Sequence, residues 1–186
     1  ANNVARYGNS TMQLKIVGFF LFLFFSYGLM LTSKTVLFFS LTYLLFGVSV
    51  LLLFFNIAHD AAHGVAVRNK KVNKVLFLVS FQLLGQNPFL WGKNHTESHH
   101  MYPNVEESDV DVLNVFGMRV TESVDLKWYH RYQFIYVPFY YMFYSINWLF
   151  FRNILSLFNY TARTISTKMT VKETAWLLVF KAGFFF

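Results

Sequence analysis

Residues 15–60 read KIVGFFLFLFFSYGLMLTSKTVLFFSLTYLLFGVSVLLLFFNIAHD, in which Lys34 is the only charged side chain between Lys15 and Asp60. A helix that crosses a bilayer needs about 17–25 apolar residues. The uncharged runs on the two sides of Lys34 both reach that length. We therefore predict one span over residues 16–33 and a second over residues 35–58. A short connection joins them, so the pair forms a transmembrane hairpin.

The composition of the whole chain agrees with a membrane protein. Of the 186 residues, 55% are hydrophobic and 13% are charged, whereas a soluble domain has about 25% charged residues. The chain has no Cys, which excludes disulfides, thiolate nucleophiles and Cys-based metal sites. The formal net charge of +7 suits an anionic membrane surface. No nucleic-acid-binding motif accompanies that charge, so we expect no nucleic acid partner.

Further apolar runs extend the predicted topology. Residues 132–151 are uncharged and rich in Phe and Tyr, and they predict a third span; a fourth starts at residue 174 and continues to residue 186. Residues 59–131 carry eight Lys and Arg side chains, which predicts a cytoplasmic location. Within them, residues 75–92 are uncharged but contain amides and a proline, which are costly at bilayer depth. This run is therefore predicted to lie on the surface or to re-enter the membrane.

These runs together predict an all-α, multi-pass membrane protein. Two transmembrane hairpins flank a cytoplasmic helical cap formed by residues 59–131. The chain starts without Met and ends inside an apolar run. We therefore expect residues 1–186 to be a single domain that is truncated at its C-terminus.

Five of the six histidines fall into two short groups. The first is NIAHDAAHG at residues 56–64, and the second is WGKNHTESHHMYPN at residues 91–104. Helical positions four apart lie on one face, so His59 and His63 can direct both imidazoles at one point. His95 and His99 can do the same, with His100 on a neighbouring face. Imidazole binds Fe, Zn, Cu and Ni, so the pattern predicts a metal site at the membrane surface.

Two well-known metal patterns do not fit these groups. The zinc-protease pattern H-E-x-x-H is absent, because Asp60 follows His59. Residues 97–100 form one E-x-x-H motif, but soluble di-iron carboxylate bundles need two copies and two further Glu residues. The sequence therefore favours a site that is built mainly from imidazoles.

The two groups resemble the first two histidine boxes of the membrane fatty acid desaturases, in the order H-D-x-x-H-G and then W-x-x-x-H-x-x-x-H-H-x-Y-x-N. SDVDV at residues 108–112 resembles the acidic stretch after the second box. HRYQFIY at residues 130–136 resembles the stretch before the third membrane segment. The similarity is greatest to the acyl-CoA or linoleoyl-CoA desaturase-like, front-end type.

The resemblance implies a di-iron enzyme that uses O₂ to insert a double bond into an acyl chain. It implies metal ligation by five side chains: His59, His63, His95, His99 and His100. The family's third box, of Q-x-x-H-H type, does not occur in this sequence. We therefore expect these 186 residues alone to be inactive. The implied partners are a fatty acyl-CoA or acyl-lipid substrate, a separate electron donor of cytochrome b5 or ferredoxin type, and the lipid bilayer.

Other polar residues near the boxes are candidates to orient the ligand rings through hydrogen bonds. They are Asn56, Asp60, Asn94, Asn104, Asp109, Asp111 and His130. Asp109 and Asp111 are equally well explained as a solvated acidic turn, and His130 as an interfacial histidine. Trp91 is a candidate to line an acyl tunnel, or it is an interfacial aromatic residue. A basic cluster can steer CoA or lipid phosphates, or it simply reflects the positive-inside rule: Arg68, Lys70, Lys71 and Lys74.

Three other functions remain open from the sequence. A related di-iron membrane hydroxylase or ketolase uses similar boxes and differs in its product. A non-enzymatic metal or haem carrier would need fewer histidines than the five found here. An inactive fragment would differ from these only in its lack of turnover.

Overall fold

The computed structural model describes residues 7–106, 108–109, 112, 117–152 and 170–185. Every regular element in this part of the chain is a helix, which confirms the predicted all-α class. Contacts divide the chain into two compact units, residues 1–84 and residues 85–186. Each unit is considered by itself.

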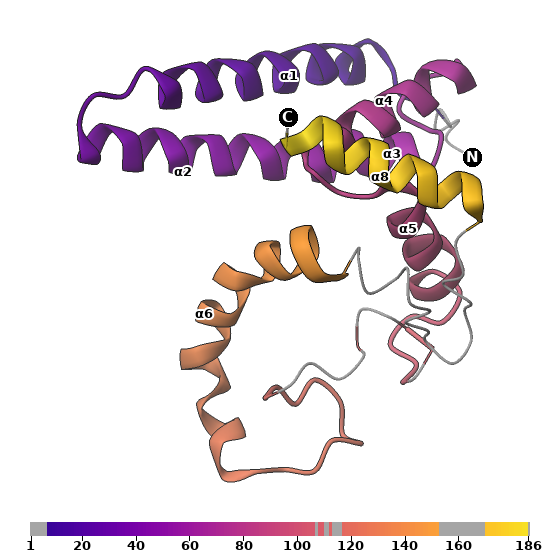
Figure 1. The fold of residues 1–186 in the computed structure, drawn as a ribbon. Coiled ribbons are helices and arrows are strands. Elements are labelled where there is room, and N and C mark those ends of the chain that lie inside the picture. Colours follow the sequence, from indigo (N-terminus) through magenta and orange to yellow (C-terminus); the bar gives the residue numbers. More distant parts are fainter. Residues whose placement is uncertain (1–6, 107, 110–111, 113–116, 153–169, 186) are drawn as a thin grey trace. The chain divides into compact units, whose positions relative to one another are not determined.

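The first unit begins with a long helical hairpin (Figure 1). Helix α1 is Ser10–Leu31 and helix α2 is Val36–Leu53. Asn9 and Thr35 cap the two helices, since each side chain accepts a hydrogen bond from a backbone N–H of the first turn. Helix α1 starts six residues before the predicted span. The span was predicted from the apolar run, and the polar first turns of the helix lie outside that run.

Helix α2 continues past its α-helical part without a break. The π-helix η1, Phe54–Ala58, follows it, and α3, His59–Ala62, ends the run. Two helical segments, Ser10–Leu31 and Val36–Ala62, are long and apolar enough to cross a membrane, with mean hydropathies of 2.0 and 2.4. They overlap the two spans predicted from residues 16–33 and 35–58 but have different ends.

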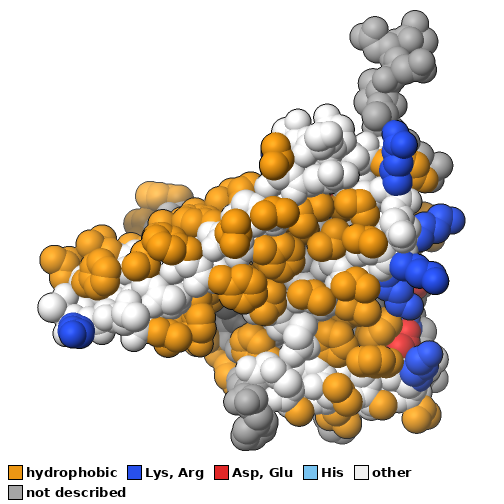
Figure 2. Space-filling view, turned by 90° about the horizontal axis from the view of Figure 1, so that it is seen from above, with side chains coloured by type: hydrophobic (Ala, Val, Ile, Leu, Met, Phe, Trp, Pro, Cys, Tyr) orange, Lys and Arg blue, Asp and Glu red, His pale blue; other side chains and the backbone are white. Residues whose placement is uncertain are grey.

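Contacts between α1 and α2 hold the hairpin together. Leu23 packs with Leu53 and Ile57 in a buried cluster, and the buried hydroxyls of Ser26 and Ser49 share a hydrogen bond of 3.0 Å. Hydroxyl pairs of this kind are common where two helices approach closely in lipid. On the face seen in Figure 2 many hydrophobic side chains lie along the hairpin, and a single basic group lies at its tip. This is the pattern of a lipid-facing hairpin.

Helix α4, Lys70–Leu83, completes the first unit. In the second unit α5, Pro88–Lys93, runs directly into the π-helix η2, Asn94–His99. The run of residues 75–92 is therefore broken into two helices, separated by Gly85 with a φ of 65°. A break of this kind agrees with the prediction that the run does not cross the membrane as one helix.

The C-terminal half of the second unit contains the 3₁₀-helix η3, Trp128–Tyr132, helix α6, Gln133–Ile146, and the π-helix η4, Asn147–Arg152. Helix α8, Val171–Phe185, follows. Among the described residues only the two segments of the first hairpin meet the length and hydropathy of a span. The predicted third and fourth spans, residues 132–151 and 174–186, therefore remain predictions. Residue 186 lies outside the described residues.

Candidate metal centre

The first histidine pair lies at the end of the helical run that starts with α2. His59 and His63 are one α-helical turn apart, and the His63 N–H donates to the His59 carbonyl at 3.2 Å. Their ring centroids are 4.7 Å apart. Gly64 ends the helix with a φ of 69°, a conformation that costs glycine little. The expected pairing of these two imidazoles is thus present.

A buried asparagine on α4 holds the loop that follows the first pair. The Asn73 amide donates to the carbonyls of Gly64 and Val67, at 2.9 and 2.6 Å, and its oxygen accepts from the Val67 N–H at 3.0 Å. Asn73 belongs to neither histidine group and to no motif of the sequence. Its signal is an amide at a buried position of an amphipathic helix, where a buried polar group needs partners.

The second histidine group follows π-helical rather than α-helical spacing. In η2 the His100 N–H donates to the His95 carbonyl, five residues earlier, at 3.0 Å. The His95 and His100 Nε2 atoms are 3.0 Å apart and their ring centroids 4.4 Å, whereas the His95 and His99 centroids are 5.8 Å apart. The segment is thus a π-helix rather than the α-helix on which the expected pairing of His95 and His99 rests, and the ligand role of His99 stays a prediction. A π-helix aligns positions five apart, which brings His100 over His95.

A buried carboxylate orients the third imidazole of this group. Asp109 is fully buried, and its Oδ2 is 3.0 Å from the His99 Nδ1. The same oxygen accepts from the backbone N–H of Asn104 at 2.9 Å. A carboxylate accepts and an imidazole N–H donates, so this contact fixes the proton on Nδ1 and leaves the lone pair on Nε2. Asp109 thus lies where a residue that orients a ligand ring would lie.

Trp91 packs on the ring of His95. The two ring systems are nearly parallel, with centroids 4.3 Å apart and an interplanar angle of 22°. The indole therefore limits the rotation of the imidazole. This contact was not anticipated from the sequence, although Trp91 and His95 are four residues apart. The expected role of Trp91 in an acyl tunnel remains a prediction.

The other candidates for ring orientation make different contacts. The Asn56 amide donates to the Leu52 carbonyl of its own helix at 2.9 Å, and an Asp60 oxygen is 3.4 Å from His59 Nδ1. The Nδ1 of buried His130 accepts from the Lys127 N–H at 3.0 Å and so caps its own turn. Asp111 lies outside the described residues.

Asn94 lies directly before His95 and is buried. Its Oδ1 has no hydrogen-bond partner among the described residues. Buried acceptors without a donor are uncommon in folded proteins. The amide oxygen is therefore suited to contact a further group at this site.

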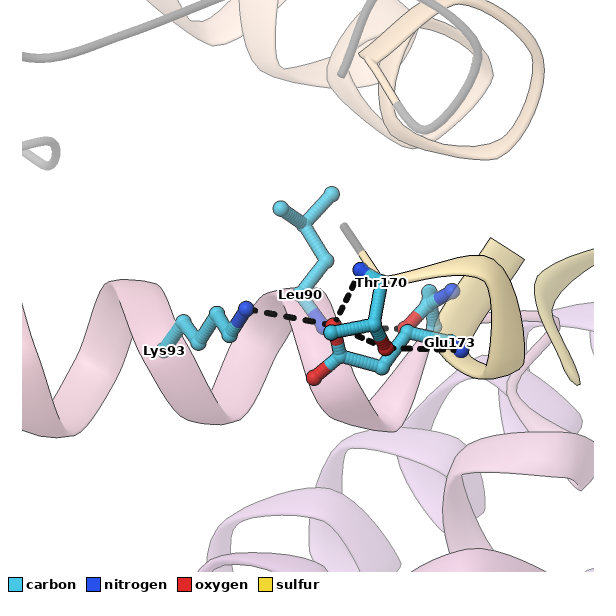
Figure 3. Close-up of polar contacts among 5 residues, drawn as sticks. Leu90, Lys93, Thr170 and Glu173 are labelled. Carbon is cyan, nitrogen blue, oxygen red and sulfur yellow. Dashed lines mark hydrogen bonds and ion pairs between the residues drawn. The ribbon is translucent and has the colours of Figure 1, made fainter. Parts of the chain in front are cut away.

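An ion pair joins the second group's helix to the start of α8 (Figure 3). The Lys93 ammonium donates to Glu173 at 3.3 Å. The same Glu173 oxygen accepts from the backbone N–H and the hydroxyl of Thr170, at 2.8 and 3.0 Å, and the Glu173 N–H donates to that hydroxyl. These reciprocal contacts form a capping box. The Thr170 contacts and the Lys93 charge lower the pKa of Glu173.

The donor set fits a metal ion that prefers imidazole. Each unit contains a histidine pair that could contribute ligands, His59 and His63 in the first unit and His95 and His100 in the second. The His95 and His100 Nε2 atoms are 3.0 Å apart, so both imidazoles would offer these nitrogens to an ion bound there.

Comparison with known proteins gives consistent matches. A sequence model of the family described as "Fatty acid desaturase" matches residues 34–186, which include both histidine groups. An sn-1 linoleoyl-lipid 6-desaturase from Arthrospira platensis is 35% identical over 103 residues, which cover 55% of this chain and 27% of that protein. Acyl-lipid (8-3)-desaturase B from Dictyostelium discoideum is 30% identical over 137 residues, or 72% and 29%.

A third relative is an acyl-lipid (8-3)-desaturase from Physcomitrium patens, 29% identical over 121 residues, which cover 63% of this chain and 25% of that protein. The matched residues thus span only about a quarter of the length of these relatives. No solved structure gave a significant match.

Proposed function

The chain belongs to the fatty acid desaturase family, and from this premise we propose that the whole protein is an O₂-dependent fatty acyl desaturase with a histidine-ligated di-iron centre. The observation that carries the proposal is the family match over residues 34–186. Membership in this membrane-bound family makes the protein an oxidoreductase.

In this proposal both histidine groups supply ligands to one di-iron centre. The ligands are His59, His63, His95, His99 and His100. The family's third box, which these 186 residues do not contain, supplies the remaining ligands. Support comes from the family match and from the pairing of imidazoles within each group. An imidazole ligand set is neutral, so it leaves the positive charge of the metal uncompensated.

The chemistry of the reaction explains why such a centre is needed. The methylene C–H bonds of an acyl chain have no neighbouring acidifying group, so side-chain acid–base catalysis cannot start the reaction. Bound iron supplies the O₂ activation that removes two hydrogens from adjacent methylenes. The residues of this chain would hold the iron, orient the histidine rings and exclude water from the site. Asp109 keeps the His99 proton on Nδ1, and Trp91 restricts the His95 ring.

We propose an acyl-lipid as the substrate, because the relatives in Arthrospira platensis, Dictyostelium discoideum and Physcomitrium patens are named as lipid desaturases. The electron donor in this proposal is a separate protein of cytochrome b5 or ferredoxin type. The histidine groups lie on the cytoplasmic side, an orientation that rests on the Lys and Arg residues between 59 and 131.

The test is desaturation by the full-length protein in a host that lacks the product. His63→Ala and His99→Ala should abolish the new double bond while membrane insertion stays intact. Lys34→Ala, in the turn of the hairpin, is the control and should keep activity. Mass spectrometry of the acyl lipids distinguishes a desaturated from a hydroxylated or keto product. Full activity of either histidine variant would refute the proposed ligation.

A further inference from the structure

An open cavity of about 730 Å³ lies in the first unit, between the start of α1 and the start of α4. Its volume falls in the range of small-molecule sites, about 300–1,000 Å³. All of its lining residues belong to the first unit, and none is one of the box histidines. The cavity is therefore separate from the candidate metal ligands.

The lining changes from polar to apolar residues along the start of α1 and along the start of α4. Ser10 and Arg68 are among the polar residues, and Val17 and Val72 are among the apolar residues. Val17 and Val72 remain 58% and 43% exposed. An amphipathic lining of this kind fits a ligand with a polar head and an apolar tail.

Arg68 is the one charged residue that lines this cavity. Residues 1–84 contain one acidic side chain, Asp60, and among the described residues no carboxylate pairs with the Arg68 guanidinium. The neighbouring helix start adds three further cations at exposed positions: Lys70, Lys71 and Lys74. Guanidinium binds phosphate with two parallel hydrogen bonds. The charge therefore complements an anionic phosphate.

The cavity also crosses the boundary between polar and apolar sequence along α1. It extends from Ser10 to Val17, and the uncharged run of the first span begins after Lys15. Seven residues of helix correspond to about 10 Å, which is comparable to the depth of the headgroup region. For a span that begins after Lys15, the polar lining residues fall on the headgroup side and the apolar lining residues on the acyl-chain side.

A close backbone contact fixes one wall of the cavity. The Gly8 N–H donates to the Val65 carbonyl at 2.9 Å, and a side chain at position 8 would collide with the Ala66 carbonyl. The loop before α4 is therefore held against the start of α1. The two walls of the cavity keep their spacing without a ligand.

We propose that this cavity binds one anionic phospholipid of the surrounding bilayer, with its phosphate at Arg68 and an acyl chain along Val17 and Val72. The site is independent of the proposed desaturase function, because it uses none of the metal ligands. Val75 and Val79 continue the exposed apolar edge of α4. In this proposal they extend the surface that contacts the acyl chain of the lipid.

The test is native mass spectrometry of the purified chain in detergent, titrated with dioleoyl-phosphatidylglycerol. Arg68→Met should weaken binding of this lipid by about fivefold or more, since one Lys or Arg near a lipid surface contributes about that factor. Lys34→Met removes one exposed charge at the other end of the hairpin and should change binding by less than about twofold. Val72→Trp fills the apolar wall and should also weaken binding.

Four outcomes would overturn the proposal. They are unchanged binding in Arg68→Met, an equal loss in Arg68→Met and Lys34→Met, unchanged binding in Val72→Trp, and full competition by glycerol phosphate without acyl chains. Equal loss in the two charge variants would indicate general surface attraction. Competition by glycerol phosphate would indicate a phosphate site rather than a lipid site. None of these readouts depends on bound metal or on turnover. The lipid-binding proposal can therefore fail while the desaturase proposal stands, and the reverse.

Discussion

The two histidine groups obtain their geometry in different ways. His59 and His63 lie on the last turns of a helical run that begins with α2, and α-helical spacing alone brings their rings together. His95 and His99 lie on a short π-helix that ends just before His100, and residues distant in sequence hold this segment in place. The first group is thus determined locally, whereas the second depends on tertiary contacts.

The strongest test of this difference compares two carboxylates that each lie beside a box histidine. Asp109 is fully buried and 3.0 Å from His99, whereas the Asp60 side chain is 42% exposed and 3.4 Å from His59. Loss of a partner that orients a ligand typically costs about 10–100-fold in metal affinity. Asp109→Asn should therefore weaken Co²⁺ binding by about that factor, and Asp60→Asn by less than about twofold, because an exposed contact is worth little.

The measurement is Co²⁺ titration of the metal-free protein, followed through the visible absorption of the bound ion. Circular dichroism of both variants controls for loss of helix. Equal effects of Asp109→Asn and Asp60→Asn would show that the two groups depend on their carboxylates alike. The distinction between a local and a tertiary site would then be wrong.

The same distinction explains what the sequence could predict. Hydrophobic run lengths locate the hairpin of α1 and α2, and spacing along an α-helix gives the His59–His63 pair. The rule that residues four apart share one helix face does not describe His95. Its segment is a π-helix with five-residue spacing, which the sequence pattern did not indicate. Contacts between distant residues, such as Lys93 with Glu173, depend on chain folding that periodicity does not describe. The Asn73 contacts with the loop after Gly64 also lie outside what hydrophobic periodicity predicts, because they join a helix to a loop.

A second, smaller effect is expected from the aromatic contact in the second group. Trp91→Leu removes the ring that stacks on His95, and such contacts contribute about 0.5–1.5 kcal/mol. Co²⁺ affinity should fall by about two- to tenfold, since 1.4 kcal/mol corresponds to a factor of about ten. The control is Trp128→Leu, because Trp128 is largely exposed and its ring contacts are with Tyr129 and Tyr132. A loss of the same size in the control would show that the indole contact does not position His95.

The smallest effect is expected where α8 meets the second group. The folded-state pKa of Glu173 is lowered below its ordinary value of 4.5, so the stability that its carboxylate provides is present above that value and is lost as the pH falls through the folded-state pKa. Glu173→Gln should reduce hydrogen-exchange protection of the first turn of α8 about two- to threefold at pH 7, the low end of a capping contribution. The difference from the unmodified protein should vanish at acidic pH, after correction for intrinsic exchange rates.

The control is Glu97→Gln, which changes an exposed carboxylate within η2. It should leave the exchange of the first turn of α8 unchanged at both pH values. Because Lys93 loses its partner as well, slightly faster exchange across η2 in Glu173→Gln would show that the second group depends on α8. Unchanged exchange in η2 would restrict the tertiary support to Asp109.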